Sequence, residues 1–477
     1  MRGLALVLLA VIGAGGPAVA TPQVERASSL SSDAAARVDA LARRLAEQDR
    51  FSGVLAIARD GETLFVHAYG LAGREKHVPV RPDTAFALAS AGKMFTVVAI
   101  LQFVAAGRLS LDDTVGKVLP DYPNHEIATK VTVRMLLTHR GGTGDIPIFG
   151  KEDAGNRQNL RTVADYVNAL GTRPPEFEPG SKESYSNYGF VILGRMIEKL
   201  SGQSYYDYIR DHVFQPAGME HSSYPIRDEA APGVATGYTA TDWDFQPTAL
   251  RANTDTLPWR GSPAGGGVAS APDLLRFVAA LQSGRLLPVP LFTQAITAQF
   301  PGLGFGLWLG GEGRASFWGH GGGAWGMNAE VRVFPNAGYT IVCLANRDPQ
   351  VADRIADYFE ASLAGPQRVP PLFLRGTMND WSTSTPMEKT TGGTYRAEVA
   401  LKTGSYEFKI ASADWKTVDL GDGGFGPAAI RDQTQAAPLS MHGANLHLTL
   451  SADGKYVFEL QGLGDGDPQV SVRPPAR

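Results

Sequence analysis

The chain has 477 residues, 43% of them hydrophobic, and a formal net charge of −4. This length is typical of two or three domains, and the apolar content is sufficient for a large core. Because there is no basic surplus and no acidic run, nucleic acid is not expected as a partner. The single cysteine, Cys343, excludes an internal disulfide, and its apolar, β-branched surroundings predict a buried residue.

The N-terminus has the pattern of a secretory signal peptide over residues 1–20. Arg2 precedes an apolar run from Leu4 to Ile12, and the small residues Ala18-Val19-Ala20 form an A-x-A cleavage site. The run is too short to span a bilayer, and an uncleaved membrane anchor is the alternative interpretation. We therefore expect an exported protein, periplasmic or secreted, with no stable membrane span after cleavage.

Residues 21–364 combine the helical and strand patterns of one α+β domain. A helix is predicted over 32–48, followed by a hairpin over 53–69 with its turn at Asp60-Gly61. Residues 90–106 form a helix without a wide polar face, which predicts burial on all sides. Later patterns predict helices over 190–200, 271–283 and 351–363 and strands over 315–318, 329–334 and 339–345. Because strands occur at both ends of this region, we expect them to share a single antiparallel sheet flanked by helices.

Residues 365–371 contain glycine and proline and are predicted to be a linker, after which the pattern changes. Residues 372–462 contain short strands separated by turns, which is typical of a small all-β sandwich. The predicted strands cover 372–375, 395–401, 404–411, 445–450 and 455–460. Residues 463–477 are expected to be a flexible tail.

The strongest candidate for chemistry is Ser90 with Lys93, in an S-x-x-K pattern. Lys93 is the only charged residue between Thr84 and Gly107, and burial among apolar residues disfavours the charged amine. A helix that begins at Ser90 places the amine beside the serine hydroxyl, where it can accept the hydroxyl proton. The N–H groups at the helix start also favour a developing oxyanion. The alternative is a serine cap with a lysine that extends to solvent.

Two polar segments follow in chain order. In Tyr185-Ser186-Asn187, alternate residues of an extended loop point the same way, so Tyr185 and Asn187 can face one site. The run from Trp318 to Gly323 includes His320 and three following glycines at the end of a predicted strand. Glycines there allow a substrate to lie against the strand edge, and a free N–H can complete an oxyanion hole. Ordinary loop polarity and a glycine-rich turn are the alternatives.

The ordered S-x-x-K, Y-x-N and H-x-G motifs resemble those of penicillin-recognising serine hydrolases. The similarity covers roughly residues 35–364 and points to the branch of class C β-lactamases, D-Ala-D-Ala carboxypeptidases, D-aminopeptidases and β-lactamase-like esterases. It also includes Leu136-Leu137-Thr138-His139 and residues 265–270. The resemblance implies a β-lactamase/transpeptidase-like domain, with an antiparallel sheet and a helical subdomain.

The same resemblance implies the roles of the site residues. Ser90 is the expected nucleophile, and Lys93 with Tyr185 is the expected acid/base system. Asn187 is expected to contact the substrate carbonyl, and the N–H groups of Ser90 and Gly323 to form the oxyanion hole. His320 and Gly322 belong to the expected substrate-binding strand. His139 falls in what resembles a structural turn of the family, outside the chemistry.

One departure from the family pattern concerns the substrate. Many β-lactamases and transpeptidases have Lys-Thr-Gly where this chain has His320-Gly321-Gly322. A lysine supplies a fixed cation for a substrate carboxylate, whereas a neutral histidine does not. We therefore expect a small-molecule or peptide substrate, such as an ester, an amide or a D-amino-acid peptide, in preference to a β-lactam.

The C-terminal module resembles the glycogen- and starch-binding modules of pullulanases and AMP-activated kinase. The resemblance rests on residues 374–381, 406–409 and 414–415. It implies polysaccharide contacts at Trp381, Lys409, Trp415 and Asn445, since aromatic faces stack on sugars and polar groups reach hydroxyls. A sandwich whose tryptophans are merely core is the alternative. A second function also stays open, that of a non-catalytic glycan-binding protein on a β-lactamase-like scaffold.

No metal site or cofactor is expected from the sequence. The nine histidines lack H-E-x-x-H and paired zinc spacings. The glycines at 302, 304 and 306 do not complete a nucleotide-binding pattern.

Overall fold

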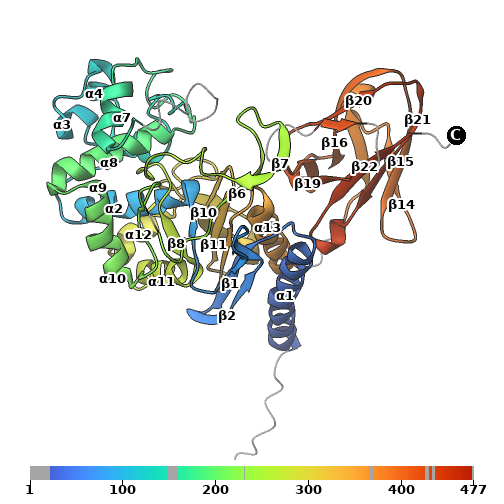
Figure 1. Cartoon of the computed structure of the whole chain (residues 1–477), viewed down its shortest axis with the longest axis horizontal. Coiled ribbons are helices and arrows are strands. Elements are labelled where there is room, and N and C mark those ends of the chain that lie inside the picture. The colour runs from blue at the N-terminus through green and yellow to red at the C-terminus, as the bar shows by residue number, and fades with distance from the viewer. Residues whose placement is uncertain are drawn as a thin grey trace, which may run out of the picture.

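The computed structural model describes residues 22–147, 159–229, 231–365, 369–424, 429–431 and 436–474. The predicted signal peptide at 1–20 therefore lies outside the described residues. Figure 1 shows an N-terminal domain of helices around a sheet, joined to a smaller domain of strands. No helix within the described ranges is both long and apolar enough to cross a membrane.

The N-terminal domain is built on a six-stranded sheet in the order β2-β1-β12-β11-β10-β9. Every neighbouring pair in it is antiparallel. Its strands are β1 (Gly53–Arg59), β2 (Glu62–Tyr69), β9 (Trp308–Gly310), β10 (Phe317–Ala324), β11 (Met327–Phe334) and β12 (Tyr339–Ala345). The early hairpin pairs with the last strand through β1 and β12, which confirms the single sheet predicted from the sequence.

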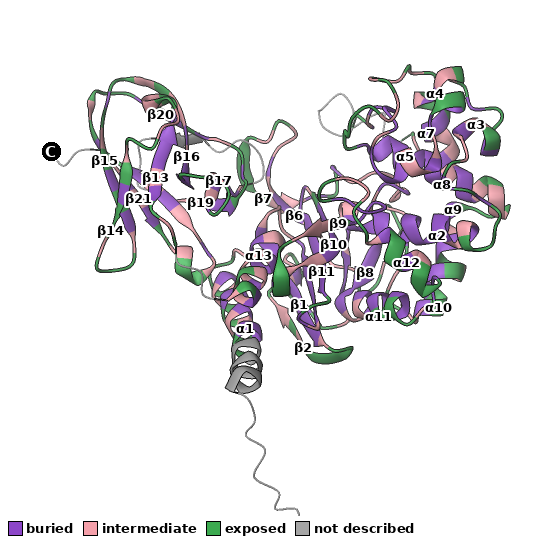
Figure 2. Cartoon of the chain, turned by 180° about the vertical axis from the view of Figure 1, so that it is seen from behind, coloured by how far each residue is buried: buried purple, intermediate pink, exposed green. Residues whose placement is uncertain are grey.

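Helices cover both faces of this sheet (Figure 2). On one face, α1 (Pro22–Glu47) and α13 (Val351–Ala364) pack in a core that includes Leu41, Ile341 and Phe359. Cys343 is buried in the same core, as predicted. On the other face lie α2 (Lys93–Ala105) and α11 (Ala271–Gln282). The alternation of side chains along each strand supplies one apolar row to each core.

A group of short helices extends beyond α2 and carries one wall of the site. It contains α3 (Val115–Val118), α4 (His125–Lys130), α5 (Val133–Leu137), α7 (Val163–Leu170), α8 (Asn187–Ser201), α9 (Tyr205–Ile209) and α10 (Gln215–Ala217), with α12 (Val289–Ala295) beside the sheet. Short strand pairs join these parts: β3 (Leu71–Gly73) with β4 (Val78–Pro79), β5 (Ala85–Ala87) with β8 (Val268–Ser270), and β6 (Tyr238–Thr241) with β7 (Pro247–Ala252).

The central helix begins differently from the prediction of one helix over 90–106. Residues Ala89–Gly92 form a 3₁₀ turn, and α2 then runs over Lys93–Ala105. In a 3₁₀ turn, residues three apart are eclipsed, so Ser90 and Lys93 still share one side. Almost every residue of α2 is buried, as its uniformly apolar sequence predicted.

The C-terminal domain is a flattened barrel, a closed form of the predicted sandwich. In the described part of the chain, eight strands pair in the ring β13-β14-β15-β21-β22-β19-β17-β16 and back to β13, while β20 and β18 extend from β16. They are β13 (Leu372–Gly376), β14 (Pro386–Lys389), β15 (Tyr395–Leu401), β16 (Gly404–Ser412), β17 (Asp419–Asp422), β18 (Ala429–Arg431), β19 (Ala437–Met441), β20 (Leu446–Leu450), β21 (Gly454–Gln461) and β22 (Gln469–Arg473). Closure leaves few open sheet edges.

The prediction of a flexible tail over 463–477 is wrong for its described part. Residues Gln469–Arg473 form β22, which lies between β21 and β19. Val470 and Val472 are fully buried in the barrel core. Their alternation with polar residues is a strand pattern, and burial of the two valines fixes the segment.

The two domains are joined by a buried ionic contact. Asp467 accepts hydrogen bonds from both terminal nitrogens of Arg50, at 2.5 and 2.8 Å, and lies 3.4 Å from Arg354 of α13. Arg354 also donates to the carbonyl of Gly423 in the barrel. Burial by itself would raise the pKa of Asp467, but hydrogen bonds and charge from the two arginines lower it below its ordinary value.

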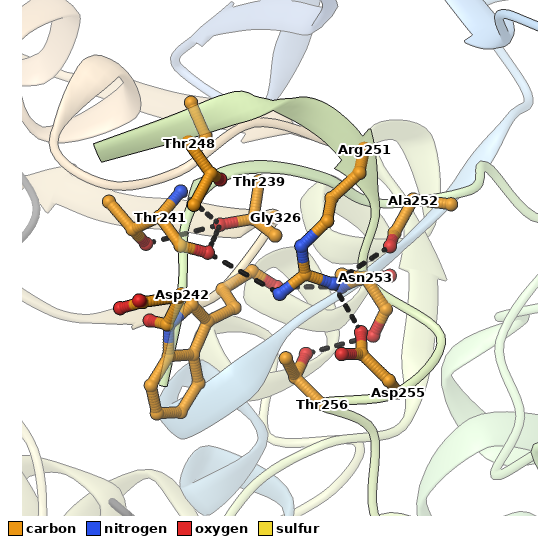
Figure 3. A network of polar contacts seen from close by, with 12 residues as sticks. Thr239, Thr241, Asp242, Thr248, Arg251, Ala252, Asn253, Asp255, Thr256 and Gly326 are labelled. Carbon is orange, nitrogen blue, oxygen red and sulfur yellow. Dashed lines mark hydrogen bonds and ion pairs between the residues drawn. The ribbon is translucent and has the colours of Figure 1, made fainter. Parts of the chain in front are cut away.

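The β6–β7 hairpin is fixed beside the turn between β10 and β11 by the polar network in Figure 3. Arg251 forms an ion pair with Asp255 and reaches the carbonyl of Thr241 at 3.4 Å. Asn253 donates to the carbonyl of Trp325 at 2.6 Å, which connects the hairpin to the end of β10. The hairpin thus supports the strand that forms one edge of the site.

Candidate active site

Ser90 and Lys93 meet at the start of α2. The Lys93 amine lies 3.2 Å from Ser90 Oγ and 2.6 Å from Asn187 Oδ1, and it also contacts the carbonyl of Ala264. Its side chain is fully buried, and burial lowers the pKa of the amine to about 7. The amide and carbonyl oxygens can only accept hydrogen bonds, so a neutral Lys93 directs its two hydrogens to them. Its lone pair then faces the Ser90 hydroxyl.

Tyr185 completes the group around the serine. Its hydroxyl donates to Ser90 Oγ at 2.9 Å, and its ring lies 4.7 Å from the Lys93 amine. Tyr185 is 38% exposed, but desolvation within the site still raises the pKa of its phenol above the ordinary value, so the phenol remains protonated near neutral pH. The phenol can therefore act as a proton donor where Lys93 acts as the acceptor.

His139 packs beneath this tyrosine. The two rings are 4.4 Å apart, and the Ser186 N–H donates to His139 Nδ1 at 3.1 Å. Burial lowers the pKa of His139 to about 3, so the imidazole is neutral. Because Nδ1 accepts this hydrogen bond, the single proton of the neutral imidazole lies on Nε2. His139 thus supports Tyr185 through packing.

Asp145 is a site residue that the sequence analysis missed. Its carboxylate accepts from the backbone N–H of Asn187 at 2.8 Å and from the Asn187 side-chain amide at 3.2 Å. Asn187 is therefore held between Asp145 and Lys93, with a hydrogen-bond partner at each end of its side-chain amide. The negative charge of Asp145 favours the protonated form of Lys93, opposing the effect of burial. The feature of the sequence that could have identified Asp145 is its place as a single acidic residue directly after Gly141-Gly142-Thr143-Gly144.

A triple glycine packs against the backbone that precedes the serine. Ala89 has a positive φ of 43°, and its carbonyl accepts from the Gly266 N–H at 2.8 Å. A Cβ at Gly265 would lie 2.7 Å from the Ala89 carbonyl oxygen, and one at Gly92 would lie 2.5 Å from the Gly266 oxygen. The family-like Gly265-Gly266-Gly267 run is thus explained by close backbone approach, which holds Ala89 in its uncommon conformation.

Strand β10 lies against the same turn. A Cβ at Gly322 would lie 2.1 Å from the carbonyl oxygen of Leu88 and 2.8 Å from the backbone nitrogen of Ser90. β9 pairs with β10 only from Phe317 to Gly319, so within the described chain the edge beyond Gly319 has no strand beside it. The structure therefore brings the predicted Gly322 against the backbone of Ser90, and Gly323 follows it along a strand edge that β9 does not cover.

His320 is buried in the wall beside this edge. Its ring stacks on Trp308 at 4.5 Å, and its Nδ1 donates to the Gly321 carbonyl at 2.5 Å. Burial and the neighbouring charge of Lys93 lower the pKa of His320 to about 3. The imidazole is therefore neutral, and the position where related enzymes carry lysine has no positive charge here.

The four predicted glycan-contact residues lie in the C-terminal barrel, on or beside β16. The rings of Trp381 and Trp415 are half-buried and 6.2 Å apart, and the Arg375 guanidinium lies 3.8 Å over the Trp415 ring. Lys409 is ion-paired with Asp419 at 2.8 Å, and Asn445 donates to Glu407 at 2.9 Å. The structure thus brings the tryptophans together, while the lysine and asparagine already have protein partners.

Comparisons with known proteins show the family to which the chain is similar. A family model described as Beta-lactamase matches residues 38–365. Penicillin-binding protein 4 of Amycolatopsis lactamdurans is 31% identical over 61% of this chain and 80% of that protein. Esterase EstB of Burkholderia gladioli is 35% identical over 40% of this chain and 51% of the esterase. The crystal structure of a penicillin-binding protein from Bacillus halodurans matches with a TM-score of 0.59 and 28% identity, over 68% of this chain and 98% of that chain.

The fold matches that of the Bacillus halodurans penicillin-binding protein, and within it Lys93 and Tyr185 converge on the hydroxyl of Ser90. The chain belongs to the β-lactamase family. Across the first relatives matched, the aligned stretch spans between 39% and 80% of the relative's own length. The family model ends at residue 365, before the C-terminal barrel.

Proposed function

We propose that this protein hydrolyses an ester, amide or D-amino-acid peptide through an acyl-enzyme on Ser90. The observation that carries the proposal is the buried Lys93 amine, which lies 3.2 Å from Ser90 Oγ and whose pKa is lowered by burial to about 7. Near neutral pH a large share of this amine is unprotonated, as a general base requires.

In the proposed reaction, Ser90 Oγ bonds to the substrate carbonyl carbon while the hydroxyl proton moves to Lys93 Nζ. The negative charge on the carbonyl oxygen is stabilised by the N–H groups of Ser90 and Gly323. When the bond to the leaving group breaks, the Tyr185 phenol protonates that group and recovers a proton from Lys93. Water then attacks the acyl carbon and gives a proton to the restored base. The bond between the acyl carbon and Ser90 Oγ breaks, Ser90 regains that proton from Lys93, and the acid is released.

The neutral His320 supports uncharged acyl groups as substrates. Its burial and low pKa leave no fixed cation for the carboxylate that β-lactams and peptidoglycan peptides carry. We therefore expect a short p-nitrophenyl ester or a D-aminoacyl anilide to be turned over faster than nitrocefin or a D-Ala-D-Ala peptide.

A serine-directed fluorophosphonate or a fluorescent penicillin tests the nucleophile. We expect labelling of the wild-type protein and its loss in Ser90→Ala. Ser405→Ala, at an exposed position of the barrel, is the matched control and should label fully. Equal labelling of Ser90→Ala and the wild type would exclude Ser90 as the nucleophile.

The C-terminal barrel supports a second role, the retention of the enzyme on a glycan. The half-buried pair Trp381 and Trp415 offers aromatic surface of the kind that stacks on sugars. Trp381→Ala should weaken retention on an immobilised maltooligosaccharide about tenfold or more, and Trp259→Ala in the other domain should not. Equal retention of both variants would indicate a purely structural pair. Glycan binding with no turnover of any substrate would instead favour the non-catalytic alternative.

Export is the remaining part of the proposal. The pattern at residues 1–20 supports a cleaved signal peptide and a periplasmic or secreted protein. The mass and N-terminal sequence of the mature protein test it, with Thr21 expected as the first residue. A retained Met1 on the exported protein would favour the membrane anchor.

A further inference from the structure

The peptide group between Gly322 and Gly323 is held from inside the sheet. The Asn328 side-chain amide donates to the Gly322 carbonyl at 3.1 Å. In a trans peptide, this carbonyl and the N–H of the next residue point in opposite directions. The Gly323 N–H is therefore directed away from Asn328, toward the strand edge beside Ser90 that β9 does not cover.

Asn328 is itself fixed in one orientation. Its side chain is only 1% exposed, and its Oδ1 accepts from the Ala352 N–H at 2.7 Å, in the first turn of α13. A flipped amide would place its NH₂ against the Ala352 donor and its oxygen against the Gly322 acceptor, so both contacts would be lost.

We propose that Asn328 is a positioning residue for the oxyanion hole. It touches neither the substrate nor Ser90, and it acts by fixing the plane of the Gly322–Gly323 peptide. This inference rests on the proposed function, in which the Gly323 N–H stabilises the carbonyl oxygen of the transition state. Glycines have little intrinsic preference for one backbone conformation, so this side-chain hydrogen bond adds to the pairing of β10 with β11 in orienting the run of three.

Two substitutions test this role. Asn328→Asp keeps an acceptor for Ala352 but sets a carboxylate oxygen against the Gly322 carbonyl, which should rotate the peptide. Asn328→Ser removes the reach of the amide without adding charge and provides a second variant if the first does not fold. Asn346→Asp is the matched control, because Asn346 is also buried and donates to two carbonyls, of Leu71 and Thr236.

The measurements are kcat and KM for a p-nitrophenyl ester and the inhibition constant of an arylboronic acid. A boronate forms a tetrahedral adduct with the serine and places an oxygen where the oxyanion would lie. For folded Asn328 variants we expect kcat to fall at least about tenfold with KM nearly unchanged. The boronate inhibition constant should rise by a similar factor, and Asn346→Asp should stay within about twofold of the wild type in both.

Each other outcome overturns the inference in a recognisable way. Wild-type kcat in the Asn328 variants, or an equal loss in Asn346→Asp, would show that Asn328 has only a structural role. Lower kcat with unchanged boronate affinity would show that the oxyanion hole is intact. Failure of fluorophosphonate to label the wild-type Ser90 would instead overturn the proposed function, and this inference with it.

Discussion

At the residue scale, the site depends on one amine whose pKa is lowered. Burial lowers the pKa of Lys93 to about 7, while the nearby Asp145 carboxylate favours the protonated amine. Asn187 stands between them and accepts a hydrogen bond from the amine. The proton affinity of the base is therefore a balance between desolvation and a single negative charge.

This balance predicts that two substitutions move the inflection in the pH profile of kcat/KM in opposite directions. In the wild type, activity should rise with pH through about 7, as Lys93 loses its proton. Asp145→Asn removes the charge that favours the ammonium, so the inflection should move to lower pH, by about one unit. Asn187→Asp adds a carboxylate beside the amine and should move the inflection to higher pH. Ester hydrolysis between pH 5 and 10 measures both, and shifts in the same direction would contradict the assignment of Lys93 as the base.

At the element scale, β10 and the turn before α2 are in contact along their backbones. The contact requires glycine at 322, since any side chain there meets the carbonyl of Leu88. Together with the triple glycine at 265–267, it fixes Ser90 between two stretches of backbone. The position of Ser90 thus depends on the absence of side chains at 322 and 265–267 as much as on the side chains that surround it.

Gly322→Ala tests this packing. The added Cβ would lie 2.1 Å from one backbone atom and 2.8 Å from the Ser90 nitrogen, so the strand must shift. We expect a loss of about 1–3 kcal/mol in the free energy of unfolding and nearly complete loss of Ser90 labelling. Gly392→Ala is the matched control, because its nearest neighbour would be 3.9 Å away. Equal melting temperatures for the two variants would show that β10 can move without cost.

At the scale of the whole molecule, Asp467 fixes the barrel to the N-terminal domain. It is almost fully buried and shared by Arg50 of the first domain and Arg354 of α13. Gly466 packs directly on the ring of Tyr358, where a side chain at 466 would clash. Residues 463–467 therefore belong to the interface, which is why the segment is ordered.

Asp467→Ala should release this interface, because the buried Arg354 and the partly exposed Arg50 lose their counter-charge. We expect a loss of about 3 kcal/mol in stability and faster proteolysis between residues 364 and 372. Asp465→Ala is the control, since Arg44 contacts only its backbone carbonyl. Because the pKa of Asp467 is lowered in the folded protein, its contribution is present above 3.8 and lost as the pH falls through the lower folded value. Similar unfolding curves for both variants would show that the ion pairs contribute nothing to docking.

The sequence by itself determined many of the elements and the local motifs that mark the candidate site. The isolated Lys93, the order of Tyr185 and His320, and the hairpin at Asp60-Gly61 were all readable as local patterns. They were readable because burial, helical spacing and turn chemistry act over a few neighbouring residues. The prediction for the tail was wrong because the alternation of apolar and polar residues in a five-residue strand is too short to identify a strand without its paired neighbours.

Only the tertiary structure decided how these residues act together. Asp145, Asn328 and Asp467 are ordinary polar residues in the sequence and acquire their importance from neighbours far away along the chain. The pKa of Lys93, the neutrality of His320 and the direction of the Gly323 N–H all depend on what surrounds each group in space. Electrostatic energies and backbone orientation are set by such non-local contacts, because desolvation and hydrogen bonding depend on distance in space rather than in sequence.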